Sequence, residues 1–191
     1  MALINGINLT MRKKPTVLNI KTIATTNFFN IEEMDIKFSN GEKRIYERLK
    51  PFENGAVLIV PMLDDETVLM IYEYSGGTDK YELVLTKGKI DDNEILVEAA
   101  NRELIEEIGF GANKLTFIKK MTIAPSYQSS ITYIVLAQDL YKAKAQGDEP
   151  ELLEVVTFRM ADLENLVYNE HLTEARSIAA LYMARDMINN Q

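Results

Sequence analysis

The segment GKIDDNEILVEAANRELIEEIGF, residues 88–110, carries carboxylates whose spacing suits the binding of a divalent cation. Residues from about 94 to 108 have the pattern of a helix, in which residues four apart lie about 40° apart around the axis. Glu103 and Glu107 then lie near the middle of one broad face, and Glu106 flanks it. The rest of that face is apolar and should pack against a sheet: Leu96, Ala99, Ala100 and Leu104.

Three acids beside an apolar face need a partner. Burying a carboxylate without one costs free energy, and crowded carboxylates raise one another's pKa. Hard oxygen ligands on one helix face suit Mg²⁺ or Mn²⁺. The alternative is a solvated acidic face, which most charge runs are. Glu98, on the opposite side of the helix, fits that alternative better than the other acids do.

The loop before the helix can complete such a cation site. Gly88 permits close approach and unusual backbone angles, so its carbonyl is a candidate further ligand. Arg102 can pair with Glu94 and tie the loop to the helix; the alternative is an ordinary surface arginine. Within this set of residues the tie is favoured.

Composition excludes several classes of chemistry. The net charge of -8 disfavours binding to polymeric DNA or RNA, which depends on lysine and arginine. With no cysteine and one histidine, His171, thiolate chemistry is excluded and a multi-histidine zinc site cannot form. We interpret His171 as a surface residue. No apolar run approaches the length of a membrane span, and the N-terminus lacks the order of a signal peptide, so we expect a cytoplasmic protein.

The elements that must position the acids are mostly short strands. Residues 16–38 have the composition of one or two strands, and Asn40-Gly41 lies between alternating segments, which indicates a hairpin. We therefore expect a small antiparallel unit at residues 1–50 and a main domain at 51–191. The main domain should contain a hairpin around residues 64–66, further strands, and two C-terminal helices near 162–168 and 173–188.

This order of elements predicts an α/β (α+β) fold, with a mixed sheet between helices. A sheet as small as the N-terminal one is unlikely to be stable alone. We expect it to pack against the main domain or against a second subunit.

The segment at 88–110 resembles the Nudix box. That motif reads Gly, five residues, Glu, seven residues, Arg-Glu, an apolar residue, any residue, Glu-Glu, any residue, Gly and an apolar residue. Every position matches, and a chance match in a chain of this length is on the order of one in ten million. The matching residues are Gly88, Glu94, Arg102, Glu103, Leu104, Glu106, Glu107, Gly109 and Phe110.

The resemblance implies a Nudix-type α/β/α sandwich that hydrolyses a nucleoside diphosphate linked to another group, with Mg²⁺ or Mn²⁺. It implies that Glu103, Glu106 and Glu107 bind the metal and that one of them helps to activate water. The carbonyl of Gly88 is implied as a further ligand, and Glu94, Arg102 and Gly109 as structural residues of the box. Such a reaction needs no covalent intermediate, which agrees with the absence of cysteine.

The similarity covers nearly the whole chain and is closest to the ADP-ribose pyrophosphatase branch. An N-terminal hairpin unit before the main domain and a proline shortly after the box, Pro125, are typical of that branch. The resemblance implies ADP-ribose, NADH and diadenosine polyphosphates as substrates, with release of AMP. The sequence departs from the branch at Ile71-Tyr72-Glu73-Tyr74, where an arginine is usual, and at Thr86-Lys87, where Pro-Ala is usual. These departures leave room for ADP compounds broader than ADP-ribose.

Other candidate residues carry open alternatives. Arg44 and Arg48, four apart on one strand, share a face and contact substrate phosphate or adenine, or else are surface arginines. The resemblance suggests Glu82 and Pro125 on the substrate side, and Glu149, in a polar loop, as the general base. The alternative for that loop is a solvated acidic segment. Three tyrosines could stack on adenine but are more often core residues: Tyr74, Tyr127 and Tyr133.

Two other functions stay open at this point. One is a Nudix-fold nucleotide-binding or regulatory module without turnover, which should have lost some of the box acids. The other is a Nudix hydrolase of a different nucleotide class. We also expect a homodimer, because the family often pairs or exchanges its N-terminal unit, and neither nucleic acid polymers nor membranes as partners.

Overall fold

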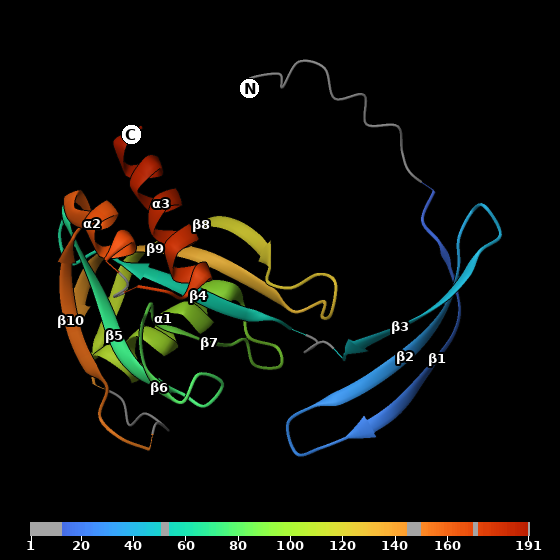
Figure 1. Ribbon diagram of the computed structural model, residues 1–191. Coiled ribbons are helices and arrows are strands. Elements are labelled where there is room, and N and C mark those ends of the chain that lie inside the picture. The colour runs from blue at the N-terminus through green and yellow to red at the C-terminus, as the bar shows by residue number, and fades with distance from the viewer. Residues whose placement is uncertain (1–12, 51–53, 145–149, 170–171, 191) are drawn as a thin grey trace. The chain divides into compact units, whose positions relative to one another are not determined.

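The computed structural model describes residues 13–50, 54–144, 150–169 and 172–190, and it divides into two compact units (Figure 1). The first unit comprises Met1–Pro51 together with Ala124–Ser129, and the second comprises Phe52–Ile123 and Ser130–Gln191. No pattern in the sequence pointed to the segment 124–129 as part of the first unit.

The first unit is a three-stranded antiparallel sheet in the order β1-β2-β3. Its strands are β1 (Thr16–Thr25), β2 (Asn30–Lys37) and β3 (Lys43–Leu49). The hairpin expected at Asn40-Gly41 joins β2 to β3: Gly41 has φ +89°, and the Phe38 N–H donates to the Glu42 carbonyl at 2.8 Å. Leu49 of β3 donates to the Tyr127 carbonyl at 2.8 Å, which attaches the segment 124–129 to this sheet.

This small sheet has little core of its own. Every residue of β1 is exposed, and Met34 is the one buried apolar residue among the described residues of the unit. Large apolar side chains remain exposed: Val17, Leu18, Ile20, Ile23, Phe28, Phe29, Ile45 and Tyr46. A three-stranded sheet without a buried face is not expected to be stable by itself.

The second unit contains two sheets. The order β10-β5-β6 forms an antiparallel sheet of three strands. The order β7-β4-β9-β8 forms a mixed sheet of four, in which β4 and β9 are parallel. The strands are β4 (Ala56–Pro61), β5 (Thr67–Ser75), β6 (Lys80–Val84), β7 (Lys87–Lys89), β8 (Phe110–Thr122), β9 (Ile131–Lys142) and β10 (Glu154–Arg159).

Helices cover both faces of these sheets, as the alternation of β4 shows. Val57 and Ile59 pack in one buried cluster with α1 (Leu96–Ile108). Leu58 and Val60 pack in the other cluster with α2 (Leu163–Tyr168) and α3 (Ala175–Asn189). A short 3₁₀ turn (Met160–Asp162) precedes α2. The expected α/β/α sandwich is confirmed, with two sheets in its middle layer instead of one.

The helix expected at 94–108 is α1, which begins two residues later and ends at Ile108. Gly109 follows it with φ 72°, a left-handed conformation that ends helices and suits glycine. No helix in the described parts of the chain combines the length and apolarity that crossing a bilayer requires.

Candidate active site

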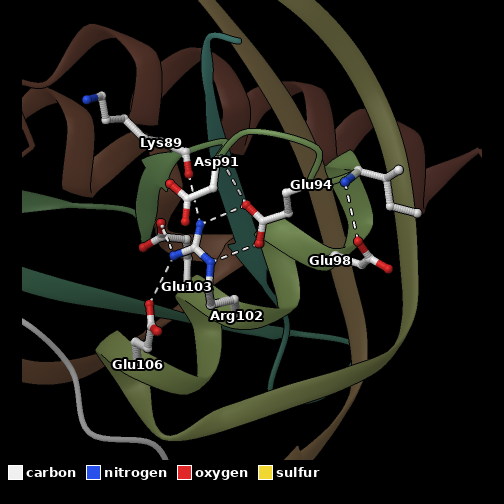
Figure 2. Close-up of polar contacts among 8 residues, drawn as sticks. Lys89, Asp91, Glu94, Glu98, Arg102, Glu103 and Glu106 are labelled. Carbon is white, nitrogen blue, oxygen red and sulfur yellow. Dashed lines mark hydrogen bonds and ion pairs between the residues drawn. The ribbon is translucent and has the colours of Figure 1, made fainter.

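Arg102 is the centre of the acidic cluster on α1 (Figure 2). Its Nε and Nη2 donate to the two oxygens of Glu94 at 2.9 and 3.0 Å. Its Nη1 donates to Glu103 at 2.7 Å and to Glu106 at 3.0 Å, and Nη2 also donates to the Lys89 carbonyl at 2.9 Å. The expected tie between Arg102 and Glu94 is confirmed, and it holds the loop before α1 against the helix.

These charge-assisted bonds shift the titration of the groups that make them. The hydrogen bonds and charge of Arg102 hold the pKa of Glu94 below its ordinary value, against the opposing effect of burial. The surrounding carboxylates raise the pKa of Arg102 above its already high value. Arg102 is therefore a permanent cation that fixes where Glu94, Glu103 and Glu106 point.

Gly88 is needed because the Glu103 carboxylate lies directly against it. Glu103 is 9% exposed. A Cβ added at position 88 would overlap the Glu103 carboxylate. Any other residue at this position would push the carboxylate away, so the first glycine of the box is explained by close approach and not by an unusual φ.

Glu107 is an acid with a strongly perturbed pKa. Burial raises its pKa to about 8; the charge of Lys87 opposes that rise, while the charges of Glu103 and Glu73 add to it. The Lys87 N–H donates to the Glu107 carboxylate at 3.3 Å. The Lys87 ammonium forms an ion pair with Glu73 on β5. A carboxylate in this setting is stabilised by any further cation placed beside it.

The edge strand β7 supplies backbone groups to these acids. In an antiparallel ladder, alternate residues direct both N–H and C=O toward the neighbouring strand, and the residues between them direct both groups away. The Thr86 carbonyl accepts a hydrogen bond from the Ile59 N–H of β4 at 2.9 Å, so Gly88, two residues later, faces β4 as well. Lys87 and Lys89 then face away from β4, as their bonds to Glu107 and Arg102 show. On this alternation, the Lys87 carbonyl is turned away from β4, whereas the Gly88 carbonyl is turned toward β4.

The site suits a hard divalent cation by its donor set. Carboxylate oxygens from Glu103, Glu106 and Glu107 come from one helix face, and Glu107 is partly buried without full charge compensation. Within the described ranges, no three carboxylate or histidine side chains are placed so that they could hold a metal ion, and Glu103 and Glu106 are both bonded to Arg102. The chemistry of the donors therefore fits such a cation, whose binding must compete with these bonds.

The other sequence-predicted residues lie in different surroundings. Arg44 pairs with Glu42 at 2.8 Å, and Arg48 pairs with Glu32 at 2.8 Å, both within the first unit. Pro125 is exposed and lies in the segment 124–129 of that unit.

In the second unit, Glu82 accepts a hydrogen bond from Thr173 at 3.0 Å and pairs with Lys80 at 3.4 Å. Glu149 and His171 lie outside the described residues, so their roles stay predictions. The structure thus brings the box residues together and assigns local ion pairs or hydrogen bonds to Arg44, Arg48 and Glu82.

The ion pair of Lys87 with Glu73 was not foreseen as part of the site. The two residues are 14 positions apart, on strands of different sheets. In the sequence, Glu73 and Lys87 stood out only because they lie in two segments that differ from the pattern usual in the ADP-ribose pyrophosphatase branch. Spacing along the chain could not have joined them, because their meeting depends on how the two sheets pack.

Comparison with known proteins decides the family. A model described as the NUDIX domain matches residues 53–181, and a model of the N-terminal domain of NudE-type Nudix hydrolases matches residues 15–48. The chain belongs to the Nudix hydrolase family. Nudix hydrolases generally depend on a divalent metal, which agrees with the donor set on α1.

Individual relatives show which members of the Nudix hydrolase family this chain is similar to. It is 49% identical to the ADP compounds hydrolase NudE of Escherichia coli (strain K12), over 94% of this chain and 96% of that protein. It is 28% identical to an ADP-ribose pyrophosphatase of Bacillus subtilis (strain 168), over 86% and 91% of the two chains. A crystal structure of an ADP compounds hydrolase superposes with a TM-score of 0.89 at 48% identity, covering 94% of this chain and 97% of that one.

Proposed function

We propose that this Nudix hydrolase cleaves the pyrophosphate bond of ADP-linked compounds and releases AMP. The observation that carries the proposal is the 49% identity, over 94% of the chain, to a protein named as an ADP compounds hydrolase. The complete set of box acids supports turnover, because a module that only binds nucleotide would not need to keep all of them. ADP-ribose, NADH and diadenosine polyphosphates are the proposed substrates.

We infer that Mg²⁺ or Mn²⁺ binds to Glu103, Glu106 and Glu107. A backbone carbonyl completes the ligand set; Gly88 is the candidate from the motif, and Lys87 is the candidate from the alternation of β7. When bound, the metal neutralises the pyrophosphate charge, orients water and lowers the pKa of that water.

Other residues of the chain orient the proposed metal ligands. Arg102 directs Glu103 and Glu106 to one side of α1, and the Lys87 N–H directs Glu107. Glu149 remains the proposed general base, which takes the proton of the attacking water. Water adds across the P–O–P bridge, so AMP leaves as one product and the phosphate ester of the other half as the second.

Arg44, Arg48, Glu82 and Pro125 are the proposed substrate-side residues. Arg44 is exposed and Arg48 is partly exposed, so a phosphate competes with the carboxylates that now hold them. Residues 1–50 are proposed as a separate N-terminal unit and residues 51–191 as the catalytic domain.

A turnover panel tests the function. Purified protein with Mg²⁺ is incubated with ADP-ribose, NADH, NAD⁺, diadenosine triphosphate and dGTP, and the products are separated by chromatography. AMP from the ADP-linked compounds is expected. Turnover of dGTP alone would overturn the substrate class but leave the metal site in place, and no turnover at all would favour a binding module.

A further inference from the structure

The diphosphate group of an ADP compound needs protein donors as well as a metal, and Arg102 cannot supply them. A guanidinium has five N–H donors. In Arg102 these make five hydrogen bonds, two to Glu94 and one each to Glu103, Glu106 and the Lys89 carbonyl. An approaching phosphate could reach Arg102 only by displacing a carboxylate of the site or the Lys89 carbonyl.

Lys87 is differently placed. Its side chain is 20% exposed, and the side chain of Glu73, with which it pairs, is 27% exposed. Within the described part of the chain, Glu73 is the only side chain bonded to this ammonium, which has three N–H donors. The ammonium is also close enough to Glu107 for its charge to oppose the rise in the pKa of that acid. Lys87 is thus a partly solvated cation with spare donors beside the acids.

The backbone around Lys87 lies against two of the acids on α1, so the residue that carries this cation is next to the proposed metal ligands. Its N–H holds Glu107, and the next residue, Gly88, lies against Glu103. A phosphate held beside these acids would therefore approach the residue that carries the ammonium. Phosphate oxygens are strong acceptors for ammonium groups, and a lysine acts there as a point charge on a flexible stem.

We propose that Lys87 is a substrate-binding residue that donates to the diphosphate of ADP compounds, and that Glu73 holds its ammonium until the diphosphate takes over. This inference rests on the proposed function. It differs from a purely structural reading, in which the pair of Lys87 with Glu73 only joins β7 to β5 across the two sheets. In the structural reading both partners stabilise the fold and neither competes with substrate.

The two readings predict different directions for the effect of Glu73→Gln on diphosphate binding, relative to the effect of Lys87→Gln. If Glu73 competes with phosphate for the ammonium, Glu73→Gln frees Lys87 and strengthens diphosphate binding. If the pair is only structural, Glu73→Gln and Lys87→Gln break the same contact and change binding in the same direction. The backbone N–H that holds Glu107 is kept in both variants.

The experiment measures binding of α,β-methylene-ADP, which is not hydrolysed, by calorimetry in the presence of Mg²⁺. Lys87→Gln should weaken binding by about tenfold to a hundredfold, the range expected for one hydrogen bond to a charged group. Glu73→Gln should strengthen it severalfold. Lys87→Arg should retain most of the affinity, and Lys114→Gln, an exposed charge change on β8, should leave it unchanged.

A double variant removes the effect of leaving Glu73 without its partner. In the Glu73→Gln background there is no ion pair to break, so adding Lys87→Gln reports on the ammonium alone and should weaken binding at least about tenfold. A change below about twofold in that background would overturn the proposal, as would a weakening by Glu73→Gln equal to that by Lys87→Gln. Thermal unfolding of each variant shows that it is folded. The turnover panel on the wild type is separate: normal turnover with these negative results rejects the role of Lys87 and retains the function.

Discussion

At the residue scale, the chemistry of this protein depends on carboxylates that are restrained from several sides. Arg102 binds three of them, Gly88 leaves room for Glu103, and the Lys87 N–H holds Glu107. Each restraint reduces the freedom of a side chain before substrate arrives, which lowers the entropy cost of assembling a metal site. The same packing partly buries Glu107, and this burial raises the pKa of its carboxyl group.

Glu107→Gln tests the metal assignment. The amide keeps the size of the side chain but removes its charge, so a metal ligand is lost and turnover of ADP-ribose should fall by roughly a hundredfold or more. The free energy of unfolding in the absence of metal should not fall, because the charge of a partly buried carboxylate is removed. Steady-state kinetics and urea unfolding measure the two quantities. Glu98→Gln, on the exposed side of α1, is the matched control, and near wild-type turnover by Glu107→Gln would contradict the assignment.

At the element scale, the segment between β6 and β7 is held by the start of α3. Glu174 caps α3 by accepting from Ser177 N–H at 2.8 Å and Arg176 N–H at 3.3 Å. The Ser177 hydroxyl donates to Glu174 at 2.8 Å and accepts from Leu85 N–H at 3.1 Å. Leu85 and Thr86 lead directly into β7, so this C-terminal helix helps to place the strand that carries Lys87 and Gly88.

Glu174→Gln tests this connection through its dependence on pH. Burial acts to raise the pKa of Glu174, but the bonds and charge of Arg176 and the bonds of Ser177 outweigh it and lower the pKa below 4.5. A lowered pKa in the folded state means that the carboxylate stabilises the fold above pH 4.5 and that this contribution disappears as the pH falls through the folded-state value.

The variant should therefore lose about 1 kcal/mol of unfolding free energy at pH 7, the usual size for a helix cap. The difference from wild type should shrink as the pH falls below 4.5. Urea unfolding at several pH values measures it, with Glu164→Gln, on the exposed surface of α2, as the control. A difference that stays constant down to pH 3 would show that Glu174 does not act through its charge.

At the scale of the whole molecule, the first unit needs a partner surface. All of β1 is exposed, and so are large apolar side chains such as Phe28 and Ile45 on the strands and turns around it. Exposed apolar surface of this kind is characteristic of an interaction site. A second copy of the chain is the proposed occupant.

Light scattering tests the homodimer. Full-length protein should show a mass near twice the 21.7 kDa of one chain. Ile45→Asp places a charge on an exposed apolar position of β3 and should shift the mass toward that of one chain. A mass of 21.7 kDa for the wild type would rule the dimer out.

Much of the site could be predicted from local pattern. The helical period placed Glu103, Glu106 and Glu107 together, and the spacing of Arg102 from Glu94 predicted their ion pair, because residues on one helix and its preceding loop are neighbours along the chain. The hairpin at Asn40-Gly41 is equally local, since its two turn residues and flanking strands are contiguous. The sequence by itself therefore determined the family, the placement of the three acids on one helix, and most of the helices and strands.

Tertiary packing alone decided the rest. Lys87 meets Glu73 only because β5 and β7 belong to two sheets brought together in the second unit. Ser177, which is bonded to Glu174, accepts from Leu85 across 92 positions of the chain, and the segment 124–129 joins the first unit through Leu49. The physical reason is the same in each case: a hydrogen bond or ion pair across a long loop depends on the position of whole elements, which the local periodicity of a chain does not encode.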